Sequence, residues 1–161
     1  MAPEPRIITV FGATGLQGSA VVRSLLKDQV SHFQVRAITR DPDSEKSQAL
    51  RKLGVEVVKG NGWNKDDMQR AFSGSWGAFV NTNSDDPVSH SIVIVAKPIL
   101  IRVKVFQQNN APTEFDLGRT IIDGIVAAGV KNLVLSSMKP AAEATAGKMN
   151  IKTMDSKFWI P

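Results

Sequence analysis

The stretch VFGATGLQGSA, residues 10–20, places three glycines at a fixed spacing between an apolar run and a segment of helical periodicity. The run before it, residues 6–11, is rich in β-branched side chains and ends at a glycine, as a buried strand does. Residues 15–27 then repeat apolar side chains along one helix face. A glycine turn between a strand and a helix is typical of a phosphate site, because the free N–H groups and positive dipole at a helix N-terminus bind anions.

Each glycine of this turn has an expected task. Gly12 makes the sharp turn out of the strand, Gly15 lets backbone approach a pyrophosphate, and Gly18 lets the helix pack closely on the strand. The spacing is G-x-x-G-x-x-G, which keeps these three tasks while shifting the turn. We assign to the same cofactor site the other turn residues and the end of a later strand: Thr14, Leu16, Gln17, Asn81 and Thr82.

Strand and helix patterns alternate along the rest of the chain. Further strands are expected at residues 33–39, 55–58, 77–82 and 132–137, and helices at 44–53, 64–72 and 115–128. Asp43 is the expected N-cap of the helix at 44–53, and Gly54 its expected C-cap. This alternation predicts one α/β domain over residues 1–161. We expect a Rossmann-like, doubly wound parallel sheet with its first strand central and its ligand at the carboxyl edge of the strands.

The end of the second strand selects between the two nicotinamide dinucleotides. An acid there grips a ribose 2′-hydroxyl, whereas an arginine accommodates a 2′-phosphate. Arg40 stands there, about twenty residues beyond the third glycine, so the sequence favours NADP(H). Asp41 follows directly and weakens this preference, which leaves NAD(H) as the alternative.

The composition argues against several kinds of site and segment. The chain has no cysteine and only two histidines, so we expect neither a disulfide nor a metal site. The N-terminus lacks a basic segment followed by an apolar one, and we expect a cytoplasmic or nucleocytoplasmic protein without a secretory signal or membrane span.

The net charge of +5 does not indicate nucleic-acid binding. Three of these charges, Lys97, Arg102 and Lys104, lie in the acid-free segment 88–113, and without them the count falls to +2. No run of five basic residues occurs, so we expect no direct contact with DNA.

Several segments in order resemble the NmrA-like family, which comprises atypical relatives of the short-chain dehydrogenases. They are ITVFGATGLQGSAVVRSLL, VRAITRDP, LGVEVVKGN, FVNTNSDD, GVKNLVLSSM and MDSK. The resemblance implies a dinucleotide-binding Rossmann fold that prefers NADP(H), in proteins that act as redox sensors or transcriptional regulators through a protein partner. The nitrogen-metabolite repression protein that names the family is a fungal corepressor of a GATA-type transcription factor. Other relatives are active reductases.

The resemblance also supplies a test for catalysis. Short-chain reductases pair a proton-donating tyrosine with a lysine four residues later, and the lysine lowers the pKa of the phenol. Lys157 matches the lysine, but Thr153 stands at the tyrosine position and the chain has no tyrosine at all. We therefore expect Lys157 to be a vestigial or weak catalytic residue, and the protein to bind NADP(H) without efficient turnover. The alternative is an NADPH-dependent reductase of the isoflavone-reductase-like type.

Two departures from the family pattern stand out. Segment 88–113 interrupts it. Its apolar part, residues 92–106, is too short for a membrane helix and predicts a β-hairpin or an aggregation-prone pair of strands. This segment is either a genuine insertion or translated intron sequence, which transcript sequencing across Pro87 and Thr113 decides. The chain also stops just after Lys157, where the family continues into a smaller C-terminal region. A truncated chain with exposed apolar surface, and a non-functional product, are therefore further expectations.

Overall fold

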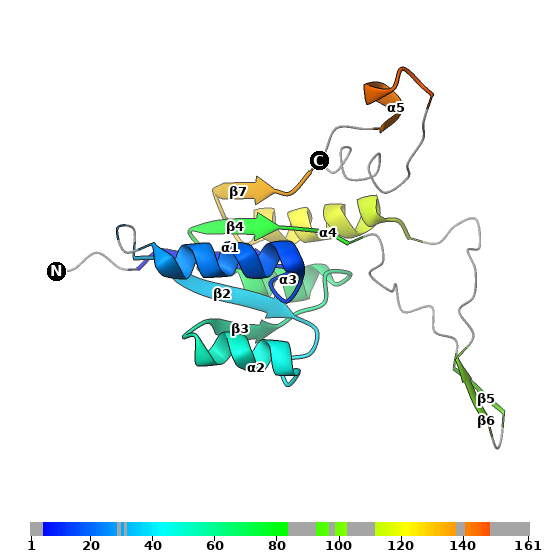
Figure 1. Ribbon diagram of the computed structural model, residues 1–161, viewed down its shortest axis with the longest axis horizontal. Helices are drawn as coiled ribbons and strands as arrows, with labels where there is room; N and C mark the ends of the chain where they lie inside the picture. Colours follow the sequence, from blue (N-terminus) through cyan, green and yellow to red (C-terminus); the bar gives the residue numbers. More distant parts are fainter. Residues whose placement is uncertain are drawn as a thin grey trace.

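The computed structural model describes residues 5–28, 30, 32–83, 93–96, 99–102, 112–137 and 141–148. Strands and helices alternate along them (Figure 1). The elements are β1 (Ile7–Phe11), α1 (Leu16–Lys27), β2 (Gln34–Thr39), α2 (Glu45–Lys52), β3 (Glu56–Lys59), α3 (Lys65–Phe72), β4 (Gly77–Val80), β5 (Val93–Ala96), β6 (Ile99–Arg102), α4 (Glu114–Ala127), β7 (Asn132–Leu135) and α5 (Ala141–Ala144).

Five strands form one parallel sheet in the order β3-β2-β1-β4-β7. The first strand is central, as the sequence predicts, and the strand order reverses beside it, between β1 and β4. In open α/β sheets, ligands bind outside the carboxyl ends of the strands at such a reversal. The Rossmann-like, doubly wound α/β fold is therefore confirmed.

Two helical layers cover the sheet, and each has its own apolar core. Side chains alternate between the faces of β2, so Val35 and Ala37 join one core while Ile38 joins the other. α1 and α2 cover the first face through Val22 and Leu50, and α3 and α4 cover the opposite one (Figure 1). The second core comprises Ile38, Met68, Ala71, Phe72, Ala78, Val80, Leu117, Ile121 and Ile125. Burial on both faces explains why the strands are short, apolar runs.

The expected caps of α2 are wrong by one residue at each end. Ser44, not Asp43, is the N-cap, and its hydroxyl oxygen accepts the N–H of Ser47 at 3.4 Å. Leu53 is the C-cap, and Gly54 follows it with a φ of +84°, the left-handed conformation that favours glycine. Asp and Ser cap equally well, so composition alone did not choose between the two neighbours.

The fourth strand is also shorter than expected, since β4 ends at Val80 rather than Thr82. Val80 is the last residue of β4 paired on both sides, with Phe11 of β1 and Leu135 of β7. Gly12 then turns β1 away with a φ of +78°. Asn81 and Thr82 consequently leave the ladder at the carboxyl edge.

The expected hairpin within segment 92–106 is confirmed. β5 and β6 form a two-stranded antiparallel sheet in which Val93 faces Arg102 and Ala96 faces Ile99. No helix among the described residues is long and apolar enough to cross a membrane.

The two edges of the main sheet differ in polarity. β3 begins with Glu56 and ends with Lys59, and charged side chains discourage further pairing of an edge strand. β7, at the other edge, leaves Leu133 40% and Val134 62% exposed. The described fold therefore exposes apolar side chains at its β7 edge.

α4 begins with a reciprocal capping box. The Thr113 hydroxyl oxygen accepts the N–H of Asp116, and an Asp116 carboxylate oxygen accepts both the N–H and the hydroxyl of Thr113 at 2.7 and 2.8 Å. The Thr113 N–H is the larger cause, and the Thr113 hydroxyl the next, of an Asp116 pKa below its ordinary value. The cap is therefore strongest when Asp116 is ionised.

We predict that Asp116→Ala lowers the free energy of unfolding by about 1 kcal/mol at pH 7. A folded-state pKa below the unfolded one stabilises the protein above about pH 4, and this contribution is lost as the pH falls through the folded value. Urea unfolding of both proteins from pH 7 towards about pH 2 should show the difference shrinking. Asp123→Ala, on the exposed side of α4, is the control. A difference that is constant with pH would contradict the assignment.

Candidate functional site

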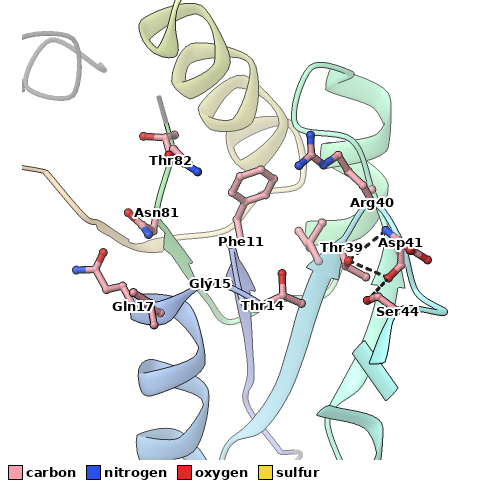
Figure 2. Close-up of a pocket in the computed structure, with 15 residues that line it drawn as sticks. Phe11, Thr14, Gly15, Gln17, Thr39, Arg40, Asp41, Ser44, Asn81 and Thr82 are labelled. Carbon is pink, nitrogen blue, oxygen red and sulfur yellow. Dashed lines mark hydrogen bonds between the residues drawn. The ribbon is translucent and has the colours of Figure 1, made fainter. Parts of the chain in front are cut away.

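A cavity of about 660 Å³ opens at the carboxyl ends of β1, β2, β3 and β4 (Figure 2). It lies at the reversal in strand order, where the fold predicts a ligand. Its lining residues are Phe11, Gly12, Thr14, Gly15, Leu16, Gln17, Ile38, Thr39, Arg40, Asp41, Ser44, Gly60, Asn81, Thr82 and Asn83. The cavity wall thus contains every cofactor-site residue expected from the sequence except Gly18.

Gly12 forms the floor of the turn after β1. Its φ of +78° favours glycine, and a Cβ built on it would lie 2.8 Å from the backbone oxygen of Asn81. Its own carbonyl oxygen accepts the N–H of Gly15 at 3.0 Å, which closes the turn. Any side chain at Gly12 would therefore separate the β1 turn from the end of β4.

Gly18 lies beneath the cavity rather than in its wall. A Cβ on Gly18 would lie 2.2 Å from the carbonyl oxygen of Gly12 and 2.9 Å from the Cα of Ala13. Both contacts are to backbone, which cannot rotate out of the way. Only glycine lets α1 approach the turn this closely.

The N-terminus of α1 differs from those of the three helices that follow it. Ser44, Asn64 and Thr113 cap α2, α3 and α4 with side-chain oxygens, whereas the N-cap of α1 is Gly15, which has no side chain to do so. The first turn of α1 also contains no acid. Its N–H groups and positive dipole end therefore face the cavity without a competing anion from the helix itself.

The loop after β2 forms the opposite end of the cavity from Gln17 and Asn81 (Figure 2). Thr39, Arg40, Asp41 and Ser44 line this end. An Asp41 carboxylate oxygen accepts the N–H of Asp43 at 3.0 Å, which turns that oxygen toward the loop's own backbone. The cavity thus has the basic side chain of Arg40 at one end and the uncapped N-terminus of α1 at the other.

The β4 side of the cavity is held by a buried contact that the sequence did not reveal. The Thr82 hydroxyl donates to a Glu114 carboxylate oxygen at 2.7 Å, and the two residues are 1% and 9% exposed. Glu114 lies 32 residues further along the chain and reads in the sequence as an ordinary first-turn acid of a helix. Only its tertiary placement shows that it fixes Thr82.

Ser136, just after β7, contacts the start of α1. Its hydroxyl donates to the side-chain oxygen of Gln17 at 2.8 Å, and its N–H donates to the carbonyl oxygen of Val80. This contact ties the end of β7 to the glycine turn. The sequence predicts a strand over residues 132–137 and does not reveal this contact, whereas β7 ends at Leu135.

The sequence also singled out a lysine and the threonine four residues before it. Lys157 and Thr153 lie outside the described residues. The structure, over the part of the chain that it describes, contains no group of three His, Asp or Glu side chains placed to hold a metal ion. The wall also includes three apolar or small residues that the sequence did not single out, Phe11, Ile38 and Gly60. Nothing but their places at strand ends could have signalled them.

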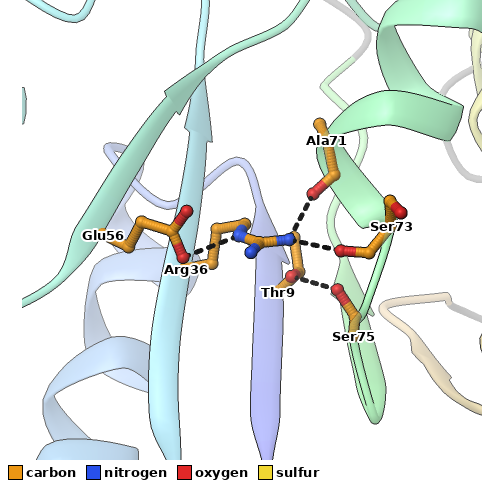
Figure 3. Close-up of polar contacts among 6 residues, drawn as sticks. All are labelled: Thr9, Arg36, Glu56, Ala71, Ser73 and Ser75. Atoms are coloured by element: carbon orange, nitrogen blue, oxygen red, sulfur yellow. Dashed lines mark hydrogen bonds and ion pairs between the residues drawn. The ribbon is translucent and has the colours of Figure 1, made fainter.

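A second polar cluster lies on the same strands and has a structural role (Figure 3). The Arg36 guanidinium donates to Glu56 at 2.8 Å and to the carbonyl oxygens of Ala71 and Ser73 at 3.1 and 2.7 Å. These carbonyls lie at the C-terminal end of α3, where a cation interacts favourably with the helix dipole. Since the guanidinium is occupied by β3 and α3, it ties both to β2 and does not form part of the cavity.

The chain is similar in sequence to proteins of one family. The sequence profile described as the NmrA-like family matches residues 4–161. The chain is 50% identical over 153 residues to the NmrA-like family domain-containing oxidoreductase lnbB of Aspergillus flavus, covering 95% of this chain and 41% of that protein. It thus spans about two-fifths of the length of the curated relatives it matches.

Two solved structures share the fold. NmrA, a negative transcriptional regulator in complex with NAD, has a TM-score of 0.69 at 22% identity, covering 98% of this chain and 41% of that one. The NADPH-dependent quinone oxidoreductase QOR2 of Escherichia coli, complexed with NADPH, has a TM-score of 0.64 at 24% identity, covering 94% and 42%. At these identities the likeness concerns the fold alone.

We predict that Gly18→Ala destabilises the protein by about 2–3 kcal/mol, because its new methyl group overpacks against backbone. The sign of the stability change distinguishes the two effects, because helix propensity alone favours alanine over glycine by about 1 kcal/mol and would stabilise the variant. Ser24→Ala, on the exposed side of α1, should change the free energy of unfolding by at most about 0.5 kcal/mol. Denaturant unfolding measures both variants. An unchanged or raised stability of Gly18→Ala would refute the close approach.

Proposed function

Because the chain belongs to the NmrA-like family, we propose that it binds a nicotinamide dinucleotide, with NADP(H) preferred, and works as a redox sensor or transcriptional regulator through a protein partner. The observation that carries this proposal is one cavity with an uncapped helix N-terminus at one end and the Arg40 loop at the other. A dinucleotide phosphorylated on its ribose presents anions at two such points.

The pyrophosphate is proposed to bind at the start of α1. Gly12 and Gly15 leave no side chain between the backbone and a ligand, and the N–H groups of Leu16 and Gln17 follow in the first turn. Hydrogen bonds from N–H groups to an anion are shorter and stronger than those between neutral groups. Gly18 acts beneath this site by letting α1 reach its position.

Arg40 is proposed to select the phosphorylated cofactor. A guanidinium forms paired hydrogen bonds with a phosphate, and Arg40 belongs to the loop after β2 where such a phosphate is expected. Asp41, also in the wall, opposes a second anion by charge. NAD(H) therefore remains the alternative ligand, as the NmrA complex with NAD illustrates for a protein of the same fold.

Efficient turnover is not part of the proposal. Reduction of a carbonyl requires hydride at carbon and a proton at oxygen, and this chain has no tyrosine to supply the proton. The threonine at position 153 has a hydroxyl that is a far poorer acid near neutral pH. A reductase is nevertheless the second candidate, because curated relatives about 50% identical are named oxidoreductases.

Calorimetric titration with NADP⁺, NADPH and NAD⁺ tests binding and selection. We predict that the chain prefers the phosphorylated forms, and that Arg40→Ala weakens their binding about tenfold or more while leaving NAD⁺ unchanged. Lys46→Ala removes a cation from the exposed side of α2 and should keep the preference.

Each other result has a clear meaning. Binding without selectivity would remove the role of Arg40. A chain that binds none of the three dinucleotides would contradict the proposed function and favour a non-functional product.

A steady-state assay tests the absence of turnover. We predict no sustained oxidation of NADPH with a panel of quinones and aldehydes, and the same background rate for Lys157→Ala, because no phenol is present for the lysine to activate. An active reductase under identical conditions is the positive control. Sustained oxidation that Lys157→Ala abolishes would establish the reductase candidate instead.

A further inference from the structure

The loop between β2 and α2, residues 40–43, is held by side chains of the helix that follows it. Ser47 donates to the carbonyl oxygen of Asp41 at 2.7 Å, Arg51 to that of Pro42 at 2.8 Å, and Gln48 to that of Asp43 at 2.9 Å. Three consecutive carbonyls thus receive donors from α2. A surface loop in which three of four carbonyls are held has lost much of its conformational freedom before any ligand arrives.

Ser47 is the buried member of this set. Its side chain is 0% exposed, and its hydroxyl oxygen also lies 2.8 Å from that of Ser44 and 3.4 Å from that of Thr39. The Ser47 hydroxyl has one proton to donate, and the Asp41 carbonyl oxygen, at the shortest of these distances, is its best acceptor. Removing this hydroxyl would leave a buried, hydrogen-bonded cluster without its centre.

The cluster fixes the backbone on both sides of Arg40. Thr39 precedes Arg40, and its hydroxyl donates to the Asp41 carbonyl and accepts the Asp41 N–H, both at 3.2 Å. Asp41 follows Arg40 and carries the carbonyl that Ser47 holds. The backbone on either side of Arg40 is therefore fixed by contacts of its two neighbours, Thr39 and Asp41.

We propose that Ser47 is a positioning residue for selectivity: through the Asp41 carbonyl it holds Arg40 where a ribose 2′-phosphate binds. This rests on the proposed function. The pyrophosphate is proposed to bind at the start of α1, so loosening the β2–α2 loop costs the phosphorylated dinucleotide the Arg40 contact that the unphosphorylated one does not make. Ser47 lies outside the cavity wall, so it acts through the loop.

The test is the ratio of the dissociation constants of NADH and NADPH, measured by titration of the full chain. Ser47→Ala should weaken NADPH binding about three- to tenfold, the value of one hydrogen bond, and leave NADH binding unchanged. Gln48→Ala is the matched control, because it removes the donor to Asp43 at the far end of the same loop from an exposed position. The control should retain most of the ratio.

If Ser47 had only a structural role, the substitution would have a different effect. Ser47→Ala would then lower the melting temperature with an unchanged ratio of dissociation constants, or weaken the binding of both dinucleotides equally. Either result overturns the inference. If Ser47→Ala does not fold, Ser47→Cys keeps a similar volume with a weaker donor and should show the same selective loss; an unchanged ratio there also overturns it. A wild-type chain that binds neither dinucleotide overturns the proposed function itself, whereas a preference for NADPH that survives Ser47→Ala overturns only the role of Ser47.

Discussion

Helix α1 packs so closely on the turn after β1 that a Cβ at Gly18 would lie 2.2 Å from the carbonyl oxygen of Gly12. This approach determines where the N-terminus of α1 points. Gly12, turned by its positive φ, in turn fits against the backbone of Asn81, so the end of β4 is placed by the same turn. The uncapped N–H groups, the cavity floor and the β4 wall therefore all depend on two glycines that contribute no side chain.

Most of the fold could be predicted because its signals are local. Short apolar runs alternate with amphipathic segments, and this alternation alone implies a parallel sheet with covered faces. What the sequence missed depends on partners. β4 stops at Val80 because both of its neighbours stop there, and no property of Asn81 or Thr82 reveals that. The choice of Ser44 over Asp43 as a cap likewise depends on backbone geometry rather than residue type.

The residues of the site also fall into those that the sequence could identify and those that only the structure reveals. Glycines at fixed spacing and an arginine at a strand end stand out in sequence, so Gly12, Gly15 and Arg40 could be named as candidates, and the structure places all three in the cavity wall. Glu114 and Ser47 could not, because an acid in a first helical turn and a serine in a polar helix are ordinary in sequence. Their significance comes from contacts to Thr82 and to the Asp41 carbonyl. Residues that position others are the ones that sequence patterns reveal least.

Recognition and reaction are separable in this architecture. In the proposed binding mode, the helix N-terminus and the β2–α2 loop contact the pyrophosphate and the ribose phosphate, which are remote from the nicotinamide carbon that exchanges hydride. Binding energy from such remote groups accelerates a reaction only when other residues use it at the reacting centre. A chain that keeps the remote contacts but has no tyrosine can still convert dinucleotide concentration into a stabilised conformation, since a ligand that binds only the folded state stabilises it by mass action. That coupling is sufficient for a sensor, and it requires no turnover.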